Sequence, residues 1–253
     1  MPSIAAVLAK AKLPWVDMVT VEPCGAVVDC RGGLRDYLRG ALGDSDLADE
    51  LAVLAMDSAR SMRAPYMSRL VGGLDVAMEL RGVSRPEGLG RGLMDAARGW
   101  RIFPDAASGI AIMRDTGYRV ALVSDVEDWL VRGIVEGSGL HVDAVYGAMG
   151  GGSGEYVSRP RAIFNAYRDS GVPLWRGLHA GTDVDSDVRP AMVLGLRTAW
   201  VNRYNEEEPE EGIASEYVVE SLEELAEQLA EGNEGRDLDG WLRGESDGEM
   251  GTQ

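Results

Sequence analysis

Residues 16–29 read VDMVTVEPCGAVVD, and this stretch decides the fold. Its first six residues, from Val16 to Val21, are apolar and rich in β-branched side chains, which favours a buried strand. Gly25 follows as a turn residue, so we expect the strand to end in a loop. That loop begins with Glu22 and Cys24, a carboxyl group and a thiol placed directly after a buried strand.

Strands and helices alternate along the rest of the chain. Leucines at helical spacing predict several helices in succession between Leu34 and Trp100. The elements expected after them are strands at 117–124, 178–181, 197–202 and 217–219 and helices at 129–135, 162–167, 188–194 and 222–229. This order predicts an α/β fold: a Rossmann-like parallel sheet with helices on both faces and an all-helical cap inserted after the first strand. Such sheets bind ligands at the carboxyl ends of their strands.

The charge is distributed unevenly along the 253 residues. Residues 1–204 contain 25 acidic and 23 basic side chains, whereas residues 205–253 contain 17 acidic side chains and only Arg236 and Arg243 as bases. The net charge of −17 therefore belongs mainly to the C-terminal part, and residues 233–253 are expected to form an acidic, disordered tail. A nearly neutral body offers no basic footprint for nucleic acid.

Several other classes of protein are also disfavoured. No apolar run approaches the ~20 residues that cross a bilayer, and the stretch Ile4–Ala9 is too short for a signal peptide, so we expect a cytoplasmic protein without membrane contact. The two cysteines, Cys24 and Cys30, are expected to be reduced thiols. Lysine occurs only at Lys10 and Lys12, so later cations are guanidinium groups and lysine-based catalysis is disfavoured.

Oxygen-bearing side chains follow three of the expected strands. Glu22 follows the first, Ser124 ends the second, and Asp183 and Asp187 follow the strand at 178–181. Because parallel strands end at the same edge of a sheet, these groups could bind a hard cation such as Mg²⁺, with Glu22, Asp183 and Asp187 as ligands. The alternative is that Asp183 and Asp187 begin a helix by accepting bonds from its first N–H groups.

The order and spacing of these motifs resemble the haloacid dehalogenase (HAD) superfamily, in particular the L-2-haloacid dehalogenase branch. The likeness runs from about residue 16 to residue 230 and includes 19–38, 100–105, 120–124 and 179–188. It implies a discontinuous core of residues 1–34 and 101–232 and a helical cap of residues 35–100. The family reaction is hydrolysis of a phosphoester or a carbon–halogen bond through a carboxylate nucleophile.

The positions that carry the family's chemistry are substituted in this sequence. Glu22 stands at the position of the aspartate nucleophile, and Cys24 stands where phosphatase members have a second aspartate. Glutamate moves the attacking oxygen by about one C–C bond, ~1.5 Å. A misplacement near 1 Å can lower a rate on the order of 100-fold.

The third and fourth motifs are altered too. The family's lysine has no counterpart, so Arg159 is the local cationic candidate. The first acid of the fourth motif falls on Thr182, with Asp183 shifted by one position, whereas Ser124 and Asp187 match. The resemblance thus predicts Glu22, Cys24, Ser124, Arg159 and Asp183 as catalytic residues of a hydrolase whose activity is weak or altered.

The sequence leaves competing functions open. The first is a Mg²⁺-dependent hydrolase of a small anionic substrate, and the alternative is a catalytically silent protein with a binding or regulatory role. A third hypothesis uses Cys24 as a thiolate nucleophile with His179 as its base. An alternative alignment of the first motif, with residues 26–34 in place of the stretch that contains Glu22, would make Asp29 the nucleophile. Arginines expected in the cap (Arg60, Arg63 and Arg69) could bind a substrate anion, and the oligomeric state is left open, a homodimer included.

Overall fold

The computed structural model describes residues 16–148, 156–209 and 215–231 of the chain. The acidic segment 233–253 lies outside the described residues, as do Ile4–Ala9, Lys10 and Lys12. The strands are β1 Met18–Val21, β2 Arg119–Val123, β3 Ala144–Tyr146, β4 Gly177–Gly181, β5 Arg197–Val201 and β6 Tyr217–Val219. The helices are α2 Pro23–Ala26, α3 Cys30–Leu42, α4 Ser45–Arg60, α5 Tyr66–Leu80, α6 Leu89–Ala97, α7 Pro104–Asp115, α8 Asp128–Ser138, α9 Arg159–Ser170, η1 Leu174–Arg176, η2 Val184–Val188, α10 Arg189–Val193 and α11 Leu222–Glu231.

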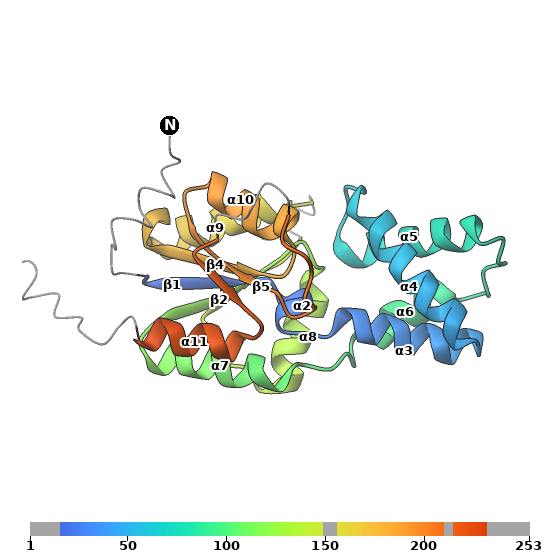
Figure 1. Ribbon diagram of the computed structural model, residues 1–253, viewed down its shortest axis with the longest axis horizontal. Coiled ribbons are helices and arrows are strands. Elements are labelled where there is room, and N and C mark those ends of the chain that lie inside the picture. Colours follow the sequence, from blue (N-terminus) through green and yellow to red (C-terminus); the bar gives the residue numbers. More distant parts are fainter. Residues whose placement is uncertain (1–15, 149–155, 210–214, 232–253) are drawn as a thin grey trace, which may run out of the picture.

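The strands form one parallel sheet in the order β3-β2-β1-β4-β5-β6, so β1 lies between β2 and β4. Helices cover both faces: α9 and α10 lie on one side and α7 and α11 on the other (Figure 1). This arrangement confirms the predicted α/β fold. The centre of the sheet brings together the carboxyl ends of the three strands that the candidate residues follow.

Alternating side chains of β1 and β2 enter two separate cores. Val19 and Leu122 pack in the core on the α7 and α11 side, whereas Met18 and Ala121 pack in the core that contains Ile163 of α9. A strand places successive side chains on opposite faces. Residue 22, directly after β1, continues this alternation onto the α9 side.

The four helices α3 to α6 follow β1 and form a lobe beside the sheet (Figure 1). Gly73 of α5 allows α5 to pack closely against α4, because a Cβ atom at this position would lie 2.2 Å from the carbonyl oxygen of Ala55. The lobe lies where the helical cap is expected.

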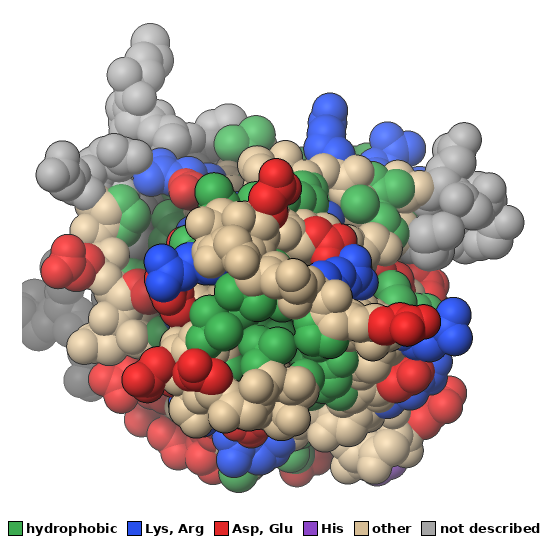
Figure 2. Space-filling model, turned by 90° about the vertical axis from the view of Figure 1, so that its right-hand side faces the viewer, with side chains coloured by type: hydrophobic (Ala, Val, Ile, Leu, Met, Phe, Trp, Pro, Cys, Tyr) green, Lys and Arg blue, Asp and Glu red, His purple; other side chains and the backbone are tan. Residues whose placement is uncertain are grey.

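The outer face of this lobe is mixed in character. Viewed from that end, the molecule presents a group of hydrophobic side chains with charged ones around it (Figure 2). Val53, Val76 and Leu80 are exposed apolar residues of the lobe. Within the described residues, no helix is both long enough and apolar enough to span a bilayer.

Three parts of the chain differ from the sequence-based expectation. The pattern of residues does not predict the short edge strand β3 or the helix α7. The helix expected at 188–194 is shorter, and the preceding π-helical turn η2 leads into it. Pro190 at the start of α10 explains the division, because a proline has no N–H to donate within a helix.

Candidate functional site

Glu22 and Ser124 meet at the carboxyl ends of β1 and β2. The Ser124 hydroxyl donates to Oε1 of Glu22 at 2.7 Å, and the backbone N–H of Cys24 donates to the same oxygen at 3.2 Å. Glu22 is 1% exposed and Ser124 is fully buried. The structure therefore brings together the first two candidate residues but encloses the carboxyl group that was expected to attack a substrate.

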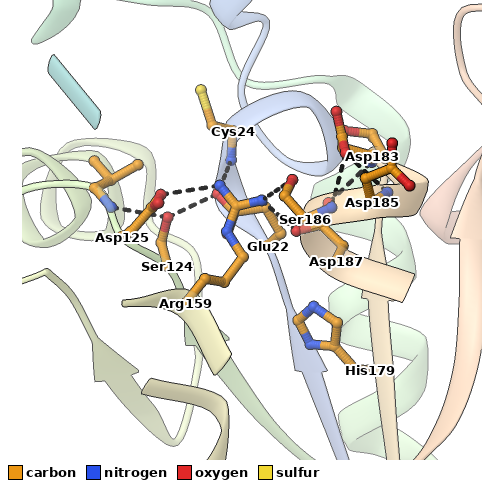
Figure 3. A network of polar contacts seen from close by, with 12 residues as sticks. Glu22, Cys24, Ser124, Asp125, Arg159, His179, Asp183, Asp185, Ser186 and Asp187 are labelled. Carbon is orange, nitrogen blue, oxygen red and sulfur yellow. Dashed lines mark hydrogen bonds and ion pairs between the residues drawn. The ribbon is translucent and has the colours of Figure 1, made fainter. Parts of the chain in front are cut away.

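Arg159, the first residue of α9, lies at the centre of the site (Figure 3). Its Nε is 3.0 Å from Oε2 of Glu22, its Nη2 donates to Oδ1 of Asp125 at 2.9 Å, and its Nη1 donates to Oδ1 of Asp187. We refer to Arg159, Glu22, Asp125 and Asp187 as the Arg159 cluster. One guanidinium group thus binds three carboxyl groups from three separate loops.

The individual contacts in this cluster differ in quality. Nη1 of Arg159 also donates to the Ser186 hydroxyl at 2.8 Å. The contact between Nε of Arg159 and Oε2 of Glu22 lacks the angle of a hydrogen bond, so it is a close ion pair only. Of the three acids, Glu22 therefore makes the weakest contact with Arg159.

Burial controls the protonation of this cluster. It raises the pKa of Glu22 from 4.5 to about 8, against the opposing effect of the Arg159 guanidinium. It also raises the pKa of Asp187. Despite its burial, Arg159 has a pKa well above its ordinary value because of the surrounding acids. Burial thus shifts Glu22 toward its neutral carboxylic acid form, which is a poor nucleophile.

Asp125 links the cluster to the helical lobe. Its Oδ2 accepts a hydrogen bond from Nη2 of Arg69, on α5, at 2.6 Å. The cluster and Arg69 together contain three acids and two arginines. Asp125 thus points inward, toward Arg159 and Arg69. The carboxylate of the nearby Glu127 accepts from the N–H groups of Met67 and Ser68, at the start of α5.

Asp183 lies apart from Glu22 and begins the turn η2. Its Oδ1 accepts from the N–H groups of Asp185 and Ser186, and Oδ2 lies 3.3 Å from Arg60. Burial acts to raise its pKa, but the bonds from Ser186 and the charge of Arg60 lower it overall. Asp183 thus caps the turn, as one of the two sequence-based interpretations has it. Asp187 instead accepts the Asp183 N–H at 2.9 Å with Oδ2 while binding Arg159 with Oδ1.

The residues present do not fit a magnesium ion. No group of three potential ligands that could hold a metal occurs in the part of the chain that the structure describes. The Arg159 guanidinium lies between the carboxyl groups of Glu22 and Asp187 and pairs with both. One carboxylate oxygen of Asp183 accepts a backbone hydrogen bond within the turn η2. The ligand set expected from the sequence is therefore occupied by internal contacts.

Cys24 requires a correction, because the structure joins it to Cys30 in a disulfide with a Cα–Cα distance of 5.7 Å. The expectation of two reduced thiols is wrong for this structure, and Cys24 has no free thiol with which to act as a nucleophile. The spacing of the two cysteines in the sequence does not predict this bond. It forms because the loop between them folds back on itself, with Gly25 at φ +103°.

The structure also disfavours His179 as a catalytic base and Asp29 as the nucleophile. His179 is fully buried on β4, and its Nδ1 lies 2.9 Å from the Thr20 hydroxyl. Its burial lowers its pKa from 6.5 to about 3, which makes it a core residue rather than a base. Asp29 accepts the N–H of Gly32 at the start of α3 and pairs with Arg101 at 2.8 Å. It therefore caps α3, which disfavours the alternative alignment in which Asp29 is the nucleophile.

A cavity of about 90 Å³ lies between the sheet edge and the helical lobe. This volume is below the ~300 Å³ at which ordinary ligand pockets begin, so it suits a small ligand. Its lining contains four arginines and two aspartates: Arg31, Arg60, Arg69, Arg159, Asp183 and Asp187. Glu22 and Ser124 are not part of this lining, and neither is Arg63.

Comparisons with known proteins identify the fold. No protein-family model matches the sequence, and no curated protein sequence matches it. Solved structures do match. A dehalogenase solved with an intermediate complex is 21% identical, with a TM-score of 0.72 over 85% of this chain and 97% of that one. The L-2-haloacid dehalogenase from Xanthobacter autotrophicus is 17% identical, with a TM-score of 0.70 over 85% of this chain and 98% of that one.

A third neighbour is the putative HAD-hydrolase YfnB from Bacillus subtilis, which was solved bound to magnesium. It is 14% identical, with a TM-score of 0.71 over 85% of this chain and 99% of that one. These structural neighbours are HAD-fold hydrolases, and each is matched over nearly its whole length. With its six-stranded parallel sheet and the helical lobe after β1, this chain has the fold of the haloacid dehalogenase superfamily, in the form found in the L-2-haloacid dehalogenases.

Proposed function

We propose that this protein binds a small anion in the cavity between core and helical lobe and does not hydrolyse it through Glu22. The observation that carries the proposal is the position of Glu22: it is buried behind Arg159, outside the cavity lining. A nucleophile must reach its substrate within about 3–3.5 Å and must be ionised. Glu22 lies outside the cavity lining, and its burial disfavours the ionised form.

The charge of the cavity supports an anion as the ligand. The lining contains four arginines and two aspartates, but Arg31, Arg69 and Arg159 are already paired with acids. Arg60 is 58% exposed along its side chain and is 3.3 Å from Asp183, so its guanidinium has donors left for a ligand. A small carboxylate or inorganic phosphate would match both the charge and the volume.

We also propose that the protein binds its anion without Mg²⁺. Arg159 supplies a permanent positive charge where a divalent cation could otherwise balance the acids. The proposal also includes the cytoplasmic location expected from the sequence.

Hydrolysis is the second candidate, and one observation favours it: Glu22, Ser124 and Asp187 do converge at one edge of the sheet. Activity assays distinguish the two candidates. With an aryl phosphate plus Mg²⁺, or with 2-chloropropionate, we expect no product or halide release above that of Glu22→Gln. Turnover by the wild type that Glu22→Gln abolishes would overturn the binding proposal and support hydrolysis.

Binding is tested with inorganic phosphate and 2-chloropropionate by calorimetry. We expect Arg60→Ala to weaken the affinity at least tenfold, because it removes a charged donor from the cavity lining. The matched control is Arg81→Ala, since Arg81 pairs with Glu50 outside the cavity lining and its loss should leave affinity unchanged. Failure of both anions to bind the wild type, or equal affinities of the Arg60 variant and the wild type, would contradict the proposal.

A further inference from the structure

The Cys24–Cys30 disulfide lies in the cavity wall and connects the segment after β1 to the helical lobe. Cys24 belongs to α2, the short helix that begins directly after Glu22. Cys30 is the first residue of α3, the helix that begins the helical lobe. Both cysteines line the cavity. Figure 3 shows the Cys24 sulfur directed away from the Arg159 cluster. A small molecule that enters the cavity therefore meets this bond.

The loop between the cysteines does not depend on the disulfide for its shape. The Gly25 N–H donates to the Val28 carbonyl at 2.9 Å, and the Val27 N–H donates to the Pro23 carbonyl at 3.0 Å. The Arg203 guanidinium donates to the carbonyls of Gly25 and Ala26, at 3.2 and 3.0 Å. These bonds remain when the sulfurs separate, so the opened form is expected to keep the fold.

The two sulfurs have different environments. Cys24 is partly exposed, whereas Cys30 is only 5% exposed. Cys30 is the first residue of the 13-residue helix α3, whose N-terminus is already capped by Asp29, so exposure is what distinguishes the two sulfurs. In thiol–disulfide exchange, the accessible sulfur is attacked and the other sulfur leaves as the thiolate. The environments therefore favour attack at Cys24 and departure of Cys30.

We propose that the Cys24–Cys30 disulfide is a redox-active bond that small thiols open from the cavity. A thiolate attacks Sγ of Cys24, the bond to Cys30 breaks, and Cys30 leaves as a thiolate that takes up a proton. A second thiol then attacks the mixed disulfide and releases Cys24. Overall, two thiols are oxidised to one small disulfide while the protein disulfide is reduced to two thiols. This inference does not depend on the proposed anion binding.

The test follows native reduction. Protein purified in air is incubated with 2-mercaptoethanol, without denaturant, and free thiols are then alkylated and counted by mass spectrometry. We expect no label before reduction and two labels afterwards, with an unchanged circular dichroism spectrum. The double variant Cys24→Ser with Cys30→Ser is the unlabelled control. A bond that resists reduction until denaturant is added would overturn the proposal, as would protein with two free thiols that 2-hydroxyethyl disulfide cannot join.

A second measurement tests which sulfur is accessible from the cavity and does not require the double variant to fold. The single variants Cys30→Ser and Cys24→Ser each keep one thiol, and both are treated with 2-hydroxyethyl disulfide. We expect the mixed disulfide to form at least tenfold faster at Cys24 than at Cys30, because Cys24 is the more exposed sulfur. Equal rates, or faster reaction at Cys30, would contradict the assignment of Cys24 as the accessible sulfur.

Discussion

The Arg159 cluster and the ion pairs of the helical lobe use the same chemical groups in opposite surroundings. Arg159 and Glu22 are 9% and 1% exposed along their side chains, whereas Arg81 and Glu50, which pair at 2.9 Å on the lobe, are 48% and 42% exposed. Exposed pairs are screened by water and contribute little. A buried arginine among three acids, in contrast, sets protonation states and fixes the position of each partner. Burial, rather than the presence of an ion pair, therefore gives the site its properties.

The largest expected effect comes from removing the centre of the cluster. Arg159→Ala leaves the carboxyl groups of Glu22, Asp125 and Asp187 buried without their cation, and breaking a buried pair in this way costs on the order of 3–5 kcal/mol. Urea denaturation should show this loss in the free energy of unfolding. Adding Glu22→Gln and Asp187→Asn should restore part of it. A loss below about 1 kcal/mol would mean that the buried Arg159 cluster contributes no more to stability than an exposed ion pair of the lobe.

An intermediate effect is expected from pH. The folded-state pKa of Glu22, about 8, is above its unfolded value of 4.5, so the folded state binds more protons between these values. The stabilising contribution is complete below pH 4.5 and is lost as the pH rises through 8. Relative to Glu22→Gln, the wild type should lose roughly 1–3 kcal/mol of unfolding free energy between about pH 5 and 9. Parallel pH profiles for the two proteins would show that Glu22 is ionised throughout.

The smallest effect is expected on the helical lobe. A double-mutant cycle of Arg81→Ala and Glu50→Ala should give a coupling energy of about 0.2–1 kcal/mol, decreasing with added salt. Thermal or urea denaturation of the four proteins provides the measurement. A coupling that matched the loss in Arg159→Ala would remove the contrast on which the comparison depends.

Local patterns in the sequence were sufficient for most of the fold. The β-branched runs around Val19 and Val120 became the central strands β1 and β2, because a buried strand needs apolar side chains on both faces. The edge strand Ala144–Tyr146 escapes prediction because it is three residues long and only partly buried, so its hydrophobic signal is weak. The meeting of Glu22 and Ser124 followed from the parallel order of their strands.

The disulfide and the role of Asp125 could not be obtained in this way. Two cysteines separated by six residues are compatible with free thiols or with a bond, and the choice depends on how the chain turns at Gly25. Asp125 follows Ser124 in sequence, but nothing local indicates whether it caps a helix or binds Arg159.

The sequence alone determined most of the strands and helices and the chemical groups at the strand ends, because side-chain periodicity and turn residues act over a few neighbouring positions. Only the tertiary structure decided which groups became partners and which were ionised. Glu22, Asp125 and Asp187 are far apart along the chain, and packing against α9 encloses them around one guanidinium. The protonation of Glu22 depends on the water removed by that packing, a quantity that no short stretch of sequence contains.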